Sequence, residues 1–237
     1  MTVNSVITSL EEVKELLLQA KLLKQENTSK SHESIVKHIS EEFRAVMFED
    51  DYERIYRTGL QHGDYFCILT DDSYLRFNAQ TVSNHIKLSY QYCPNPRSYK
   101  TYPEFLKEMG LEEFQNTDIA MEDYDQYVSE AKLNSKILPI RYDYDELSHR
   151  VPDHATSHIH FGFFEHVRIP VSKMLTPQAF VILIIKIFYF RTWQLCQDNE
   201  KYMNIEVNHK NRCSLLESEL FDKKEKMQFR LKRNKNV

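Results

Sequence analysis

The stretch TPQAFVILIIKIFYF, residues 176–190, decides the fold of this chain. Thr176 followed by Pro177 is typical of a helix start, because the hydroxyl caps the first turn and proline fits the first helical position. The following residues are apolar nearly all round, so this helix, predicted to reach Trp193, belongs at the centre of a domain. Its apolar part is about half as long as a bilayer span and contains Lys186. We therefore expect a buried core helix and no membrane partner.

The segments before this helix have the pattern of β-strands, being rich in aromatic and branched residues and bounded by turn residues. Five strands are predicted, at residues 65–69, 74–77, 85–92, 137–144 and 157–164. An apolar helix needs a partner layer to bury it. We therefore predict an α+β fold, in which an antiparallel sheet of residues 64–92 and 137–170 packs against N-terminal helices and the apolar helix 177–194.

Helical periodicity appears on both sides of the predicted sheet. A helix is expected from a cap at Ser9 to about Gln25, and a second helical pattern covers residues 35–47. Two acidic helices are predicted in the middle of the chain, at residues 102–109 and 118–133. A last helix, capped by Ser214 and Glu217, turns basic toward the end of the chain.

Composition indicates an ordinary globular protein with charge asymmetry. The chain has 237 residues, of which 41% are hydrophobic and 28% charged. Its 4 glycines and 7 prolines argue against glycine-rich phosphate loops and dinucleotide-binding turns. From Lys223 onward, seven Lys or Arg face one acid, a local charge of +6, which leaves −10 for residues 1–222 out of a total of −4. We predict one α+β domain at residues 1–195 and a C-terminal extension with a basic helix at residues 196–237.

The cysteines and the first residues indicate a reducing compartment. The 4 cysteines show no Cys-x-x-Cys spacing, so neither a zinc knuckle nor a redox pair is encoded locally. Residues 1–10 lack the basic start and apolar core of a secretory signal. We therefore expect a cytoplasmic protein.

A histidine cluster is the main candidate site. His149, His154, His158, His160 and His166 fall within eighteen residues. Side chains two apart on a strand share a face and lie about 6–7 Å apart, so His158 and His160 are spaced to grip one metal ion or one phosphate.

Arg168 lies on the same strand face as His158 and His160 if the strand continues past Gly162. A guanidinium beside two imidazoles suits phosphate, because arginine binds the anion bidentately and histidines act as acid and base near neutral pH. We therefore predict His158, His160 and Arg168 as catalytic, with His154 contributing to substrate binding.

Two interpretations of this cluster stay open besides acid–base catalysis. A divalent metal is the first, with His158, His160 and Asp143 as candidate ligands and His154 or Asp145 as alternatives for the third. The spacing of His158, His160 and Glu165 matches the first metal motif of cupin barrels, but the flanking glycines and the second histidine motif of that fold are missing. The second interpretation is structural: the imidazoles form a satisfied polar cluster at a sheet edge, hydrogen-bonded to Asp143 or Asp145.

The segment Arg141-Tyr142-Asp143-Tyr144-Asp145 places arginine and carboxylates on one strand face and tyrosines on the other. If this strand pairs with the histidine strand, it supplies carboxylates to the site, and Arg141 becomes a substrate-binding residue. A half-exposed strand with internal ion pairs is the alternative.

Several blocks of the chain, taken in order, resemble a bacterial family of uncharacterised proteins, catalogued as a domain of unknown function. The blocks are residues 69–73 (LTDDS), 92–96 (YCPNP), 141–145 (RYDYD), 157–162 (SHIHFG), 168–171 (RIPV), 175–177 (LTP) and 188–189 (FY). One departure is that Ala155 stands where the resemblance places a proline after the histidine. The chain is also similar to small toxin-like bacterial proteins with a histidine-rich strand, which implies RNA or nucleotide targets.

Together these observations favour a cytoplasmic bacterial protein acting on phosphodiester or nucleotide substrates, nuclease-like, in a defence or toxin module. The alternative is a non-catalytic partner protein of a multi-gene system, whose exposed acidic and basic segments recognise a protein encoded nearby. The acidic body argues against tight nonspecific DNA binding. An open pocket at His158, His160 and Arg168 would favour the enzyme, and burial against backbone carbonyls the partner protein.

Overall fold

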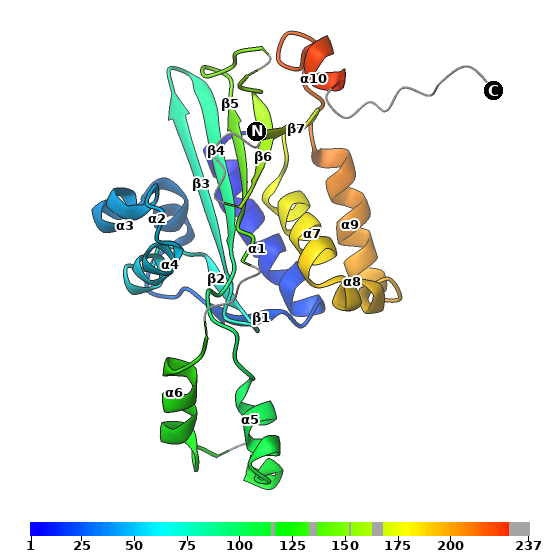
Figure 1. Cartoon of the computed structure of the whole chain (residues 1–237). Coiled ribbons are helices and arrows are strands. Elements are labelled where there is room, and N and C mark those ends of the chain that lie inside the picture. The colour runs from blue at the N-terminus through cyan, green and yellow to red at the C-terminus, as the bar shows by residue number, and fades with distance from the viewer. Residues whose placement is uncertain (115–116, 133–136, 152, 163–167, 228–237) are drawn as a thin grey trace, which may run out of the picture.

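The computed structural model describes residues 1–114, 117–132, 137–151, 153–162 and 168–227. Within them, an antiparallel sheet runs through the centre of the molecule, and each strand pairs with the next along the chain (Figure 1). The strands are β1 Leu23–Glu26, β2 Cys67–Leu69, β3 Tyr74–Val82, β4 His85–Cys93, β5 Ile140–Asp145, β6 Ser157–Phe161 and β7 Arg168–Pro170. The predicted α+β fold with an antiparallel sheet is therefore confirmed.

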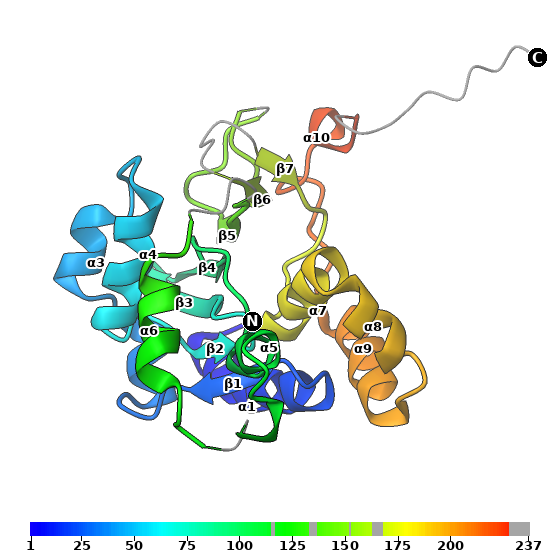
Figure 2. The ribbon, with the colours of Figure 1, turned by 60° about the horizontal axis from the view of Figure 1, so that its bottom comes forward.

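Helices cover both faces of the sheet. They are α1 Val3–Gln19, α2 His32–Lys37, α3 Glu41–Val46, α4 Tyr52–Gln61, α5 Tyr102–Glu108, α6 Met121–Ser129, α7 Pro177–Phe188, α8 Phe190–Cys196, α9 Glu200–Arg212 and α10 Lys223–Met227, with a 3₁₀ turn at Glu112–Phe114. Helices α1, α7, α8 and α9 lie on one side of the sheet, and α3 and α4 lie on the other (Figures 1 and 2). Helices α5 and α6 extend from one end of the sheet (Figure 1).

One face of the sheet forms the apolar core with α1 and α7. Alternation along the strands places Phe77, Tyr90 and Tyr142 on this face, and all three are fully buried. Phe180 of α7 packs onto them, with its ring centroid 6.4 Å from that of Phe77 and 6.0 Å from that of Tyr90. The apolar helix is therefore the central packing element, as its sequence predicted.

The opposite face of the sheet is polar along two rows. The first row crosses β3 to β7, because Arg76 pairs with Gln91, Gln91 with Arg141, Arg141 with His160, and His160 with Arg168. The second row crosses β3 to β6 and consists of Asn78, Ser89, Asp143 and His158. These rows lie on the side of the sheet that α3 and α4 cover.

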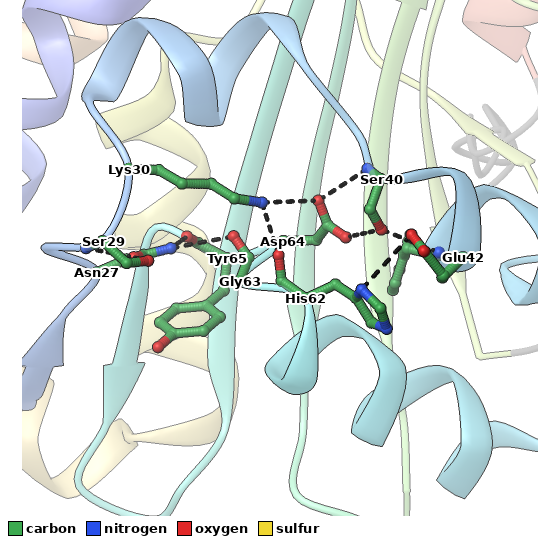
Figure 3. A network of polar contacts seen from close by, with 10 residues as sticks. Asn27, Ser29, Lys30, Ser40, Glu42, His62, Gly63, Asp64 and Tyr65 are labelled. Carbon is green, nitrogen blue, oxygen red and sulfur yellow. Dashed lines mark hydrogen bonds and ion pairs between the residues drawn. The ribbon is translucent and has the colours of Figure 1, made fainter.

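A buried polar network fastens α3 to the start of β2 (Figure 3). Asp64, only 5% exposed, accepts hydrogen bonds from the backbone N–H of Ser40, at 3.1 Å, and from the Ser40 hydroxyl. The same hydroxyl caps α3 by accepting from the backbone N–H of Phe43, at 3.0 Å. Lys30 Nζ lies 3.6 Å from Asp64 Oδ1 and donates to the carbonyl of His62. This network fixes where α3 and α4 stand over the polar face.

A glycine sets how closely α4 approaches the sheet. A Cβ added to Gly59 would collide with the buried hydroxyl of Tyr74 and lie 3.0 Å from the ring of Phe43. Any side chain at this position would therefore push α4 away from β3.

Several expected element boundaries are wrong. Helix α1 begins at Val3, because Thr2 and Ser5 form a capping box, and it ends at Gln19 where Lys21 turns to a positive φ of 54°. Residues 23–26 form strand β1 instead of the end of that helix, since β2 pairs with them. The pattern at residues 35–47 is divided between α2 and α3, because Ser40 starts a new helix through its contact with Asp64.

The apolar helix ends earlier than predicted. It breaks at Tyr189, whose hydroxyl donates to Asp71 at 2.9 Å, and α8 leaves at an angle of 116°. In the part of the chain that the structure describes, no single helix is long and apolar enough to cross a membrane, and only the bent α7–α8 pair passes by length and composition.

The segment after α8 also packs on the body. Tyr202 of α9 is fully buried, and Lys186 of α7 forms an ion pair of 2.5 Å with Glu206. The last described helix, α10, begins at Lys223 and not at the expected cap at Ser214, because Leu215 forms a β-bridge with Lys173. Most of the basic terminal residues, 228–237, lie outside the described residues.

Candidate functional site

Strands β5 and β6 place the predicted site residues directly opposite each other. Asp143 pairs with His158, and Arg141 pairs with His160. Because residues two apart on a strand share a face, all four side chains lie on the polar face of the sheet. The pairing of the two strands, which the sequence left open, is thus present in the structure.

The carboxylate of Asp143 is the centre of this cluster. Its Oδ2 lies 2.8 Å from Arg141 Nε, 3.3 Å from His160 Nε2 and 3.9 Å from His158 Nε2. Asp143, His158 and His160 each offer one ligand atom, and these three atoms all lie within 4.8 Å of one another. Burial opposes ionisation of Asp143, but the polar contact with His160 and the charge of Arg141 outweigh it and lower its pKa to about 2.

The orientation of His158 is fixed from the backbone. Its Nδ1 lies 2.6 Å from the carbonyl of Ala155, and since a carbonyl only accepts, Nδ1 carries the proton. Burial at 1% exposure lowers the pKa of His158 to about 4, so the ring is neutral at pH 7. Its Nε2 therefore turns a lone pair toward Asp143 and makes no hydrogen bond within the described residues.

Arg141 links the cluster to solvent. Its side chain is 28% exposed, its Nε donates to Asp143, and its Nη2 donates to His160 Nε2 at 3.1 Å. The guanidinium thus supplies the positive charge next to Asp143. His160 keeps its Nδ1 without a hydrogen-bond partner among the described residues.

The other predicted residues lie beside this cluster. The ring centroid of His154 is 4.8 Å from that of His158, and burial together with the charge of Arg168 lowers the pKa of His154. Arg168 stands opposite His160 on β7. Asp145 forms an ion pair with Lys87, with 2.9 Å between Oδ2 and Nζ, and is not part of the cluster. Glu165 and His166 lie outside the described residues.

A cavity of about 610 Å³ opens over one end of the polar face. Of the predicted site residues described, Arg141 and His160 line it, whereas His158 is closed off beneath them. The sequence did not predict the other lining residues as part of a site; they include Gln91 on β4 and, from the α3–α4 region, Phe48, Tyr52 and Ile55. The sequence held one signal for the polar face under this cavity. Arg76 and Gln91 are polar residues on strands whose alternate positions are apolar.

These features define an α+β protein with a carboxylate–histidine–arginine cluster on one sheet face. A comparison with protein-family models matches residues 17–232 to the family described as "Uncharacterized conserved protein (DUF2290)". The chain belongs to this family, which confirms the resemblance to a domain of unknown function. No curated protein and no solved structure matches the chain.

Proposed function

We propose that this protein is a metal-assisted phosphoesterase acting on phosphodiester or nucleotide substrates. In this proposal Asp143, His158 and His160 hold a divalent cation, and Arg141 binds a phosphate oxygen. The observation that carries the proposal is the convergence of three ligand atoms within 4.8 Å beside an arginine that lines a cavity. A place in a bacterial defence or toxin module rests on the sequence resemblance.

The chemistry of the donors supports a cation. Two imidazoles and one carboxylate are a common ligand set for Zn²⁺, Mn²⁺ and Fe²⁺. A metal-ligating histidine usually donates its other N–H to a carbonyl or carboxylate, which is the arrangement of His158 on Ala155. The lone pair of His158 Nε2 also faces the anionic Asp143, and a cation between them would be attracted by both.

The positive charge of Arg141 would have a different role once a cation is bound. A divalent cation would replace the guanidinium at Asp143 and His160, and Arg141 would then bind substrate in the cavity that it already lines. In the reaction, water adds to phosphorus, the P–O bond to the leaving alcohol breaks, and the proton from water ends on the leaving oxygen. Arg168, opposite His160, extends the positive charge toward β7.

The test combines metal binding with activity of the full chain. Titration with Mn²⁺ and Zn²⁺ should show one equivalent bound, with affinity lowered at least about tenfold in Asp143→Asn and His160→Ala. Labelled RNA, DNA and nucleotides should be cleaved, and a chelator should stop the reaction. His85→Ala is the matched control, because this histidine also contacts a carboxylate, Glu146 at 2.7 Å, but lies outside the cluster.

The outcomes separate the parts of the proposal. Cleavage that survives chelation and is lost in His160→Ala would contradict the metal and leave imidazole acid–base chemistry. A folded protein that binds no metal and cleaves nothing would refute the phosphoesterase.

The burial of His158 favours a second candidate, a non-catalytic partner protein. His158 is closed to solvent and bonded to a backbone carbonyl, and Arg141 already donates hydrogen bonds to both Asp143 and His160. In that case Asp143→Asn would lower the melting temperature without any activity to lose, and the next step would be to isolate the bound partner.

A further inference from the structure

The cavity over the polar face has two unlike surfaces. Its floor, on the sheet, includes the hydrogen-bonding side chains of Gln91, Arg141 and His160. Its wall comes from the α3–α4 region and includes the apolar or aromatic residues Phe48 and Ile55. A ligand that fits both surfaces needs an anionic or acceptor-rich end and a flat apolar end.

The floor is built to donate hydrogen bonds. Arg76, 4% exposed, lies over the ring of Phe43 at 4.3 Å from its centroid and donates to Gln91 Oε1 at 3.1 Å. Because the Gln91 oxygen accepts from Arg76, the NH₂ group of this cavity-lining residue remains available as a donor. Arg76 forms no ion pair with any described carboxylate, so a positive charge lies beside Gln91 on the same face of the sheet. An acceptor-rich anion is the ligand that such a floor favours.

The wall offers an aromatic face. The side chain of Phe48 is 68% exposed although it lines the cavity. A single exposed phenylalanine is ordinary on a protein surface. Because this exposed ring lines the same cavity as the hydrogen-bonding floor, it offers a surface on which a planar base could stack, and such stacking tolerates any base.

We infer that the cavity binds a single nucleotide unit, with its phosphate on Arg141 and Gln91 and its base against Phe48. The inference rests on the proposed function for the position of the phosphate and goes further by naming the substrate class. The volume of about 610 Å³ falls within the roughly 300–1,000 Å³ typical of small-molecule sites. Glu49 and Asp50 also line the cavity, and their carboxylates disfavour a long polyanion crossing the same opening.

The experiment measures binding to the full-length chain by calorimetry, with AMP, UMP, ribose 5-phosphate and inorganic phosphate as probes. AMP and UMP should bind at least about tenfold more tightly than ribose 5-phosphate, since base–aromatic stacking has this magnitude. Phe48→Ala should remove that preference and leave ribose 5-phosphate binding unchanged. Phe190→Ala is the matched control, because Phe190 is 52% exposed on α8 and does not line the cavity.

Two further variants test the floor. Arg141→Ala should weaken all four probes, and Gln91→Glu, which puts a carboxylate where the amide donates, should weaken them as well. Equal affinity for AMP and ribose 5-phosphate, or an unchanged preference in Phe48→Ala, would overturn the inference. The proposed function would still stand in that case if Arg141→Ala weakened phosphate binding. Binding of a single-stranded trinucleotide more than tenfold tighter than AMP would also overturn it. If no probe binds, the inference fails, and the proposed function is decided separately by metal titration and cleavage of RNA, DNA and nucleotides.

Discussion

Helices cover both faces of the sheet, but the contacts that hold them there differ between the two faces. On the core face, aromatic rings pack against one another, and the buried hydroxyl of Tyr142 accepts a hydrogen bond from the backbone N–H of Leu175 at 2.9 Å. On the polar face, charged and polar side chains form hydrogen bonds and ion pairs, and the Asp64 network holds α3 and α4 in place. The difference suggests that the core face supplies stability and the polar face supplies chemistry, since burial of charge seldom adds net stability.

The largest expected effect comes from breaking the core face. Phe180→Ala should lower the free energy of unfolding by about 3–5 kcal/mol, because a fully buried ring between Phe77 and Tyr90 is replaced by a void. Urea denaturation followed by circular dichroism would measure this. Phe48→Ala, the same truncation on the polar side, should change stability by less than about 0.5 kcal/mol. Similar losses in the two variants would contradict the proposed division between the faces.

A smaller effect is expected at the anchor of the polar-side helices. Asp64→Ala leaves the N–H and hydroxyl of Ser40 without their buried acceptor, at a cost of about 1–3 kcal/mol. Hydrogen exchange should show faster exchange in α3 and α4 and unchanged protection in α7. The control is Asp50→Ala, which removes an exposed carboxylate from the neighbouring turn. Uniform loss of protection in α7 as well would mean that the network supports the whole fold and not one layer.

The core face could be predicted from sequence because its signals are local. The apolar stretch at residues 176–190 and the alternating strands each identify their element, and one buried helix requires a sheet to cover it. The element ends that were wrong depend on distant partners. Tyr189 breaks the long helix through its contact with Asp71, and residues 23–26 become a strand because β2 pairs with them.

The candidate site was predictable only where it lies on neighbouring strands. Histidines two apart and an alternating Arg-Tyr-Asp segment indicated one face, and the structure pairs Arg141 with His160 and Asp143 with His158. The cavity wall was not predictable, since Phe48 comes from a turn almost a hundred residues earlier and no local pattern assigns it to the site. Cavities form between elements, so their lining follows from packing and not from periodicity.

The smallest expected effect concerns a titratable group buried on the core side. His209 of α9 is 2% exposed, and burial lowers its pKa below the ordinary 6.5, although Glu12, 3.7 Å away, partly opposes this. Above pH 6.5 the ring is neutral in both folded and unfolded states and adds no pH dependence. Below pH 6.5, this histidine binds a proton in the unfolded chain but not in the folded chain. The free energy of unfolding therefore falls on acidification, with a slope of at most about 1.4 kcal/mol per pH unit.

His209→Gln should therefore flatten the pH dependence of the unfolding free energy between pH 7 and 5, relative to the natural chain. The exposed neighbouring change Asn208→Gln should keep the natural slope. Since His154 and His158 have lowered pKa values on the polar side, part of the slope should remain in His209→Gln. If the slope is instead unchanged in His209→Gln, the ring is protonated in the fold through Glu12. The core side would then tolerate a charge that its packing is expected to exclude.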